Sequence, residues 1–184
     1  MTTNKSLLLT IAVGLTVFVI VMRLLPHEPN MTPVTAAAIV GGLYLGRRWA
    51  FLLPSLALLI SDMLVGFYDW KIMLSVYASF ALISGLSLVV AKYRSVLIGG
   101  ISLIGASTSF FLITNGAVWA FSPWYEKSVS GLMYAYELGL PFFRNMLLGD
   151  VVYTLAMVAV FELVIVLTAR PTFTAERAQT HSGF

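Results

Sequence analysis

The sequence predicts an all-α protein, a polytopic membrane bundle of about six transmembrane helices with both termini in the cytoplasm. Of its 184 residues, 59% are hydrophobic and only 10% are charged, whereas soluble domains carry roughly a quarter charged residues. The mean hydropathy is +0.92. The hydrophobic residues also fall into runs of about 20, the length that an α-helix needs to cross the apolar core of a bilayer.

The first two apolar runs differ in length and in composition. Ser6–Met22 contains no charged residue and is followed by Arg23. A signal peptide is the competing interpretation, but no small-residue cleavage site follows, which favours a retained helix. Val34–Gly46 is rich in small residues and short for a full crossing. Pro33 suits the first turn of that helix, where its missing N–H is not needed.

Further helices follow as far as the polar C-terminal segment. Three are predicted at Trp49–Gly66, at Ile72–Ala91 and within the uncharged run Ser95–Tyr125. Val129–Leu140 is too short to span and contains Glu137, which predicts an interfacial or re-entrant segment. Pro141 should begin the last helix, which runs to about Ala169. Residues 1–170 then form one transmembrane domain, and residues 171–184 form a polar cytoplasmic tail.

The distribution of Lys and Arg predicts the orientation. With the N-terminus inside, the cytoplasmic side holds Lys5, Arg47, Arg48, Lys92, Arg94, Arg170 and Arg177, and the outer side holds Arg23, Lys71, Lys127 and Arg144. Such an excess is typical of cytoplasmic loops. We therefore expect a multi-pass protein of the bacterial cytoplasmic (inner) membrane, with the lipid bilayer as its principal partner.

In this topology, polar residues gather in the outer half of the bundle. The candidate substrate-binding residues are His27, Asn30, Asp62, Asn115, Trp119, Arg144, Asn145 and Asp150. A charge within the membrane costs at least a few kcal/mol unless it is paired or faces water. The gathering therefore indicates an outward-facing cavity for a small molecule. The alternative is structural: Asp62 and Arg144 could form an interfacial ion pair or extend to water.

Helical spacing adds two observations, each with two interpretations. Thr108, Phe111, Asn115 and Trp119 share one helix face, as do Asp150, Tyr153 and Thr154. Aromatic rings beside polar groups suit a small ligand with a flat ring, but packing between helices explains them equally well. Ala38, Gly42 and Gly46 lie four apart, a spacing that lets helices approach closely. They serve either packing inside the bundle or contact with a coupling subunit or larger membrane complex.

The sequence contains no signal for catalysis or for nucleic acid. Cysteine is absent and there are only two histidines, which excludes thiolate chemistry and the usual metal-ligand spacings. No catalytic or phosphate-binding motif occurs, and no stretch interleaves basic and aromatic residues. We therefore expect a protein that is not an enzyme, has no cofactor and does not bind nucleic acid.

Several strings together resemble an uncharacterised bacterial family of membrane proteins with an expected role in transport. They are Leu25–Val34, Leu59–Gly66, Thr114–Trp119, Leu140–Asn145 and Gly149-Asp150, and the resemblance covers about Arg23 to Phe161. That family is similar to the substrate-capture (S) components of energy-coupling-factor transporters, which are six-helix proteins that bind vitamins or metal ions from the outer side. Many S components dock onto a coupling subunit through small residues spaced four apart in the first helix, and Ser6–Met22 has no clean pair of this kind.

Two functional hypotheses follow. In the first, the protein is a small transporter or its substrate-binding subunit for a small polar, zwitterionic or vitamin-like molecule, with Asp62, Asn115, Arg144 and Asp150 as the polar floor of the cavity. Trp119 and Tyr125 would then cover the ligand. In the second, the protein is an accessory structural subunit of a larger membrane complex and has no ligand of its own.

Overall fold

The computed structural model describes residues 5–168, and all regular secondary structure in this range is helical. The elements are α1 (Lys5–Leu24), α2 (Val34–Val40), the π-helical segment η1 (Gly41–Leu45), α3 (Arg47–Val65), α4 (Trp70–Tyr93), α5 (Val96–Phe121) and α6 (Val129–Thr168). Of the helices in the described range, α1, α3, α4, α5 and α6 are long and apolar enough to cross a membrane. The protein is therefore an all-α, multi-pass membrane protein. The predicted tail, 171–184, lies outside the described residues.

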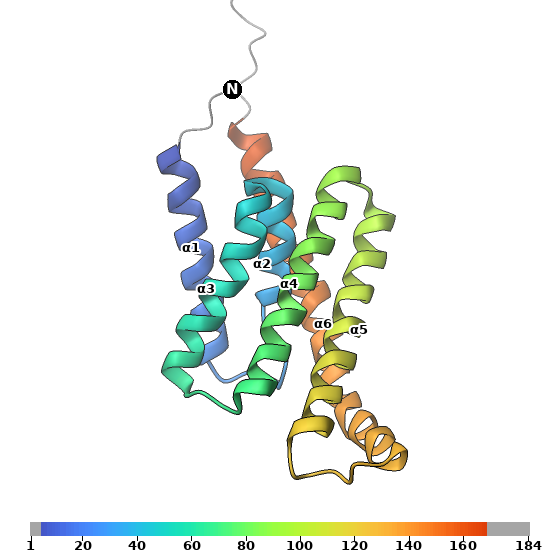
Figure 1. Cartoon of the computed structure of the whole chain (residues 1–184). Coiled ribbons are helices and arrows are strands. Elements are labelled where there is room, and N and C mark those ends of the chain that lie inside the picture. The colour runs from blue at the N-terminus through green and yellow to red at the C-terminus, as the bar shows by residue number, and fades with distance from the viewer. Residues whose placement is uncertain (1–4, 169–184) are drawn as a thin grey trace, which may run out of the picture.

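The helices run side by side between two ends of the bundle (Figure 1). The start of α1 and the end of α6 lie at one end, which we call the proximal end. The loops at residues 25–33, 66–69 and 122–128 lie at the other, which we call the distal end. Every long helix therefore joins one end to the other, as expected of membrane-crossing segments.

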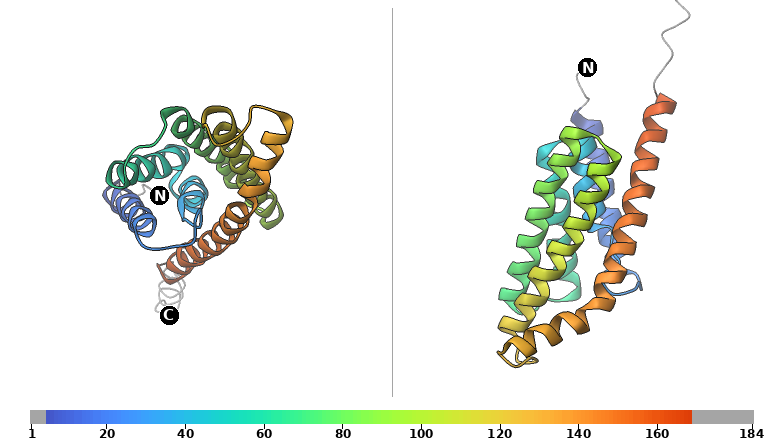
Figure 2. Two further views of the ribbon diagram at one scale, coloured as in Figure 1. Left: turned by 90° about the horizontal axis from the view of Figure 1, so that it is seen from below. Right: turned by 90° about the vertical axis from the view of Figure 1, so that its right-hand side faces the viewer.

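The short second helix lies in the middle of the bundle. Figure 2 shows α2 surrounded by the longer helices, and it packs against α3, α4 and α6. The seven residues of α2 and the five of η1 rise only about 18 Å at 1.5 Å each, less than the roughly 30 Å of a bilayer core. Residues 25–33 supply the rest of the path, so the prediction of a segment too short to cross alone is confirmed.

Small residues allow this central position. All seven residues of α2 are buried, and Ala38 is 0% exposed. A Cβ added at Gly42 would lie 2.5 Å from the Ser87 Oγ of α4, so only glycine permits this contact. Ala38 and Gly42 therefore serve packing within the bundle and do not form an external docking face. Gly46 has a different role, since it ends η1 with a φ of 99° that glycine adopts without strain.

The last helix, α6, differs from the prediction. Val129–Leu140 is not a separate segment but the first part of α6, which continues through Pro141. Figure 2 shows that α6 bends strongly along its length, and a proline inside a helix removes a backbone hydrogen bond and favours such a bend. The first part packs on α5, where the Tyr136 hydroxyl donates to the Leu112 carbonyl at 3.0 Å and the Tyr136 and Phe111 ring centroids lie 5.5 Å apart. Glu137 is exposed, so its charge does not have to be buried by this packing.

Candidate functional site

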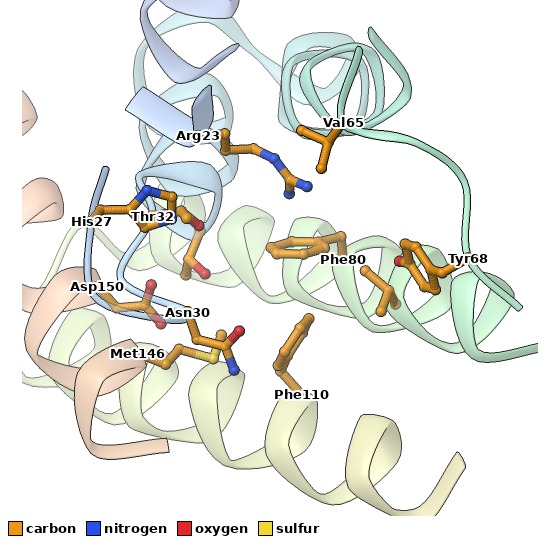
Figure 3. A pocket seen from close by; sticks show the side chains of 12 residues that line it. Arg23, His27, Asn30, Thr32, Val65, Tyr68, Phe80, Phe110, Met146 and Asp150 are labelled. Carbon is orange, nitrogen blue, oxygen red and sulfur yellow. The ribbon is translucent and has the colours of Figure 1, made fainter. Parts of the chain in front are cut away.

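A cavity of about 260 Å³ opens at the distal end of the bundle. Its rim contains the exposed residues His27, Asn30, Val65 and Tyr68, and its floor contains the buried residues Thr35, Phe80, Met146 and Asp150. In Figure 3, the polar side chains of His27, Asn30, Thr32 and Asp150 gather on one side of the view, and Tyr68, Phe80 and Phe110 on the other. The cavity therefore has a polar wall and an aromatic wall.

Asp150 is the polar centre of the floor. It is 1% exposed, and the Ser107 hydroxyl of α5 donates to its Oδ2 at 2.6 Å. The Thr35 side chain is its second hydrogen-bond partner. Within residues 5–168, no Arg, Lys or His side chain lies within ion-pair distance of this carboxylate, because the one ion pair there joins Arg23 and Asp62. Asp150 is thus hydrogen-bonded but is not neutralised by any described residue.

The ion pair occupies the end of α1 and the end of α3. Arg23 Nη2 lies 2.8 Å from Asp62 Oδ1, and the Tyr77 hydroxyl donates to Asp62 Oδ2 at 3.1 Å. Asp62 is 3% exposed and does not line the cavity, whereas Arg23 does. The structural alternative had the correct acid but the wrong base, because Asp62 pairs with Arg23 and not with Arg144.

The loop between α1 and α2 forms the polar wall. His27 Nδ1 lies 2.6 Å from the Leu25 carbonyl oxygen, and Asn30 has a φ of 65°, a left-handed conformation that asparagine tolerates better than most residues. A Cβ added at Gly149 of α6 would lie 2.9 Å from Met31 Cγ. The absence of that atom brings the loop against α6, immediately beside Asp150.

Tyr68 contributes a hydroxyl to the aromatic wall from the loop between α3 and α4. Its partial burial, and then the nearby Asp62 carboxylate, raise the pKa of its phenol to about 12. The phenol therefore stays protonated over the physiological pH range and can donate a hydrogen bond.

The remaining predicted site residues lie outside this cavity. The Asn115 amide donates to the Phe111 carbonyl at 2.9 Å, and its Oδ1 would lie 2.5 Å from a Cβ added at Gly139, so it packs between α5 and α6. Arg144 is exposed and Asn145 is half-buried, and neither lines the cavity.

Trp119 lies near the α5–α6 connection. Its indole N–H donates to the Glu126 carbonyl at 2.9 Å, and the Lys127 ammonium donates to the Trp119 carbonyl. These bonds fold the chain back after α5. Of the predicted site residues, His27, Asn30 and Asp150 are therefore the ones that the structure brings together around the cavity.

Sequence reasoning missed several residues that line the cavity or hold Asp150. Phe80 and Phe110 line the cavity with their ring centroids 5.2 Å apart, whereas the prediction chose the neighbouring Phe111, which faces α6. Thr35 and Ser107 were not predicted either. A threonine two residues after a proline and a serine within a long apolar helix give no local signal, and their role depends on where Asp150 lies.

This arrangement suits a small organic molecule with a polar end and a flat apolar part. A cavity of about 260 Å³ has the volume of eight or nine liquid waters at about 30 Å³ each. Among the described residues, no group of three or more His, Asp or Glu side chains could hold a metal ion.

Comparisons with known proteins identify the family. Neither the curated proteins nor the solved structures include a match to the chain. A family model described as a family of unknown function (DUF6580) matches residues 3–173, which is nearly the whole chain. The protein is therefore a member of DUF6580, and this member is a multi-pass membrane protein.

Proposed function

We propose that the protein binds a small polar molecule in the distal cavity and serves in its uptake, as a substrate-binding membrane subunit or a small transporter. The observation that carries the proposal is Asp150, a buried carboxylate at the floor of the cavity without a described counter-ion. Ionisable groups inside membrane helices are expensive, and they typically mark a substrate pathway or a wet cavity.

The charge arrangement supports a binding role over a purely structural one. Arg23 borders the same cavity as Asp150 but pairs with Asp62. If Asp150 served only to join α5 to α6, an uncharged side chain could accept the Ser107 hydroxyl at lower desolvation cost. A carboxylate at this place is stabilised most by a ligand that donates the hydrogen bonds it still lacks.

The proposed orientation places the cavity on the outer side of the membrane. The proximal end carries Lys5, Arg47, Arg48, Lys92 and Arg94 at helix ends and in loops, as expected of a cytoplasmic face. Because the chain has no cysteine, single cysteines can report this directly. Trp124→Cys, at an exposed distal residue, should react with a membrane-impermeant maleimide on intact cells, whereas Val96→Cys, at an exposed proximal residue, should react only after lysis. The reverse pattern would place the cavity in the cytoplasm and contradict uptake.

The resemblance to S components of energy-coupling-factor transporters gives the proposal a second support. A multi-helix bundle that binds its ligand near one membrane face is what this resemblance implies. The alternative, an accessory subunit without a ligand, relied on the small-residue spacing at Ala38 and Gly42. Both residues are used inside the bundle, so this argument for an external partner is weaker than the sequence suggested.

Native mass spectrometry of gently extracted protein tests the proposal. The cavity variant is His27→Ala with Asn30→Gly, which removes two rim side chains while glycine keeps the left-handed backbone at position 30. The matched control is Arg144→Ala with Asn145→Ala, outside the cavity. A small molecule that co-purifies with wild type and control but is depleted from the cavity variant supports the proposal. Equal retention in all three refutes the site, and an empty chain tightly bound to other membrane subunits favours the accessory role.

A further inference from the structure

The position of Asp150 also indicates the charge of the ligand. We infer that the cavity binds a molecule with a cationic nitrogen group, which the Asp150 carboxylate holds, joined to a flat apolar part that lies against Phe80 and Phe110. This inference rests on the proposed function, because it names the chemical class of the molecule bound at that same site.

The first step concerns the charges already present. Around the cavity, the positive charge of Arg23 is balanced by Asp62 at 2.8 Å, and Tyr77 holds Asp62 from the other side. This pair is complete without a ligand. Asp150 has no such partner among the described residues, so the side chains around the cavity carry an uncompensated negative charge when this carboxylate is ionised.

The second step concerns the hydrogen bonds that Asp150 still lacks. An ionised carboxylate offers about four acceptor sites, and its described partners are two hydroxyls, from Ser107 and Thr35. The residue lines the cavity, and Figure 3 shows its side chain there. An ammonium or protonated ring nitrogen would both donate to the remaining acceptor sites and neutralise the charge, and charge-assisted hydrogen bonds are the strong ones.

The third step excludes the other charge classes. An anionic group placed near Asp150 would meet a like charge in a site of low dielectric, which disfavours binding. A neutral group could donate a hydrogen bond but would leave the carboxylate charged and buried. Arg23 does not reverse this preference, because its positive charge is already paired.

The aromatic wall selects the rest of the molecule. Phe80 and Phe110 both line the cavity, with their rings tilted by 56° and their centroids 5.2 Å apart, so they offer an aromatic surface to a flat group. Aromatic faces also attract cations within about 6 Å. A cationic nitrogen close to a flat ring would therefore use both walls of the cavity at once.

Three probes of nearly equal size and different charge test the inference: benzylamine as the cation, benzyl alcohol as the neutral analogue and benzoate as the anion. Their affinities for detergent-solubilised wild-type protein are measured by isothermal calorimetry. Because an ammonium adds a positive charge to the hydrogen bond that a hydroxyl would also donate to the carboxylate, we expect benzylamine to bind about tenfold or more tightly than benzyl alcohol. Benzoate should bind more weakly than the alcohol. Equal affinities, or a preference for benzoate, would overturn the inference.

Asp150→Asn then locates the effect. It keeps the size of the side chain and removes its charge, so the preference for benzylamine over benzyl alcohol should fall to less than about threefold, while Arg144→Ala should keep the wild-type preference. A preference that survives Asp150→Asn would overturn the assignment. The wild-type comparison stands even if this variant does not fold.

The two proposals fail differently. If the molecule that co-purifies from the native membrane is neutral or anionic and leaves with the cavity variant, binding is established but the cationic class is wrong. If nothing co-purifies and none of the three probes binds, the proposed function and this inference are both wrong.

Discussion

The free energy of unfolding lost when the Arg23–Asp62 ion pair is broken should depend on which of the two residues is replaced. Removing one partner of a buried pair is destabilising by about 3–5 kcal/mol, because the other charge is left uncompensated. Asp62 is 3% exposed, whereas the Arg23 side chain is 22% exposed and borders the cavity. Arg23→Met leaves a buried carboxylate without its counter-ion, although the Tyr77 hydroxyl still donates to it, so it should cost about the full 3–5 kcal/mol. Asp62→Asn leaves a cation that can reach water, and about 1–2 kcal/mol is expected.

Thermal unfolding in detergent measures the difference. For a chain of 150–250 residues, each kcal/mol shifts the Tm by about 2–4 °C, so Arg23→Met should lower the Tm by about 6–20 °C and Asp62→Asn by about 2–8 °C. The double variant Arg23→Met with Asp62→Leu removes both charges and should recover most of the loss, since apolar replacement of a whole buried pair is often neutral.

The control is Arg144→Met, which removes an exposed arginine that forms no ion pair in the described range. It should change the Tm by less than about 2 °C, because a surface substitution usually costs no more than about 0.5 kcal/mol. A loss for Arg23→Met no larger than this control would refute the reasoning. So would a double variant whose loss equals the sum of the two single losses.

Alanine substitutions at two glycines of α6 distinguish the loop beside the cavity from helix packing outside it. A Cβ at Gly149 would lie 2.9 Å from Met31 Cγ and 3.1 Å from Met31 Cα, so Gly149→Ala should displace the loop over the cavity, cost about 1–3 kcal/mol and reduce the co-purified ligand. Gly139→Ala should cost a similar amount by its contact with Asn115 Oδ1 at 2.5 Å, but it should leave ligand retention unchanged. Gly105→Ala, with nothing within 4 Å, is the control and should change stability by less than about 1 kcal/mol. Equal ligand retention in the Gly149 and Gly139 variants would contradict the position assigned to the loop.

The transmembrane helices were the most predictable part of the structure. Predicted Ser6–Met22 and Trp49–Gly66 became Lys5–Leu24 and Arg47–Val65, because the length of an apolar run and the charges that flank it are local properties. The bend of α6 was harder to predict from the sequence. The sequence predicts a helix that starts at Pro141, whereas in the structure α6 begins at Val129 and continues through this proline.

The partners of the polar side chains were harder to predict. Membrane topology placed Arg23, Asp62 and Arg144 at one depth, but it does not give the rotation of each helix about its axis. A helix turns by about 100° per residue, so neighbouring residues such as Phe110 and Phe111 face the cavity and α6 respectively. The choice among partners at equal depth therefore depends on three-dimensional packing that a single sequence does not display.

The two buried acids of the distal half have opposite relations to the cavity, and this difference connects binding to stability. Asp62 forms an ion pair with Arg23 and accepts a hydrogen bond from Tyr77. The ion pair also keeps the positive charge of Arg23 beside Asp62. Asp150 is left for the occupant of the cavity. A ligand that binds only the folded state stabilises it by about 2.7 kcal/mol at one hundred times its Kd. Neutralising Asp150 in this way would make the loaded protein more stable than the empty one, although no contact elsewhere in the bundle needs to change.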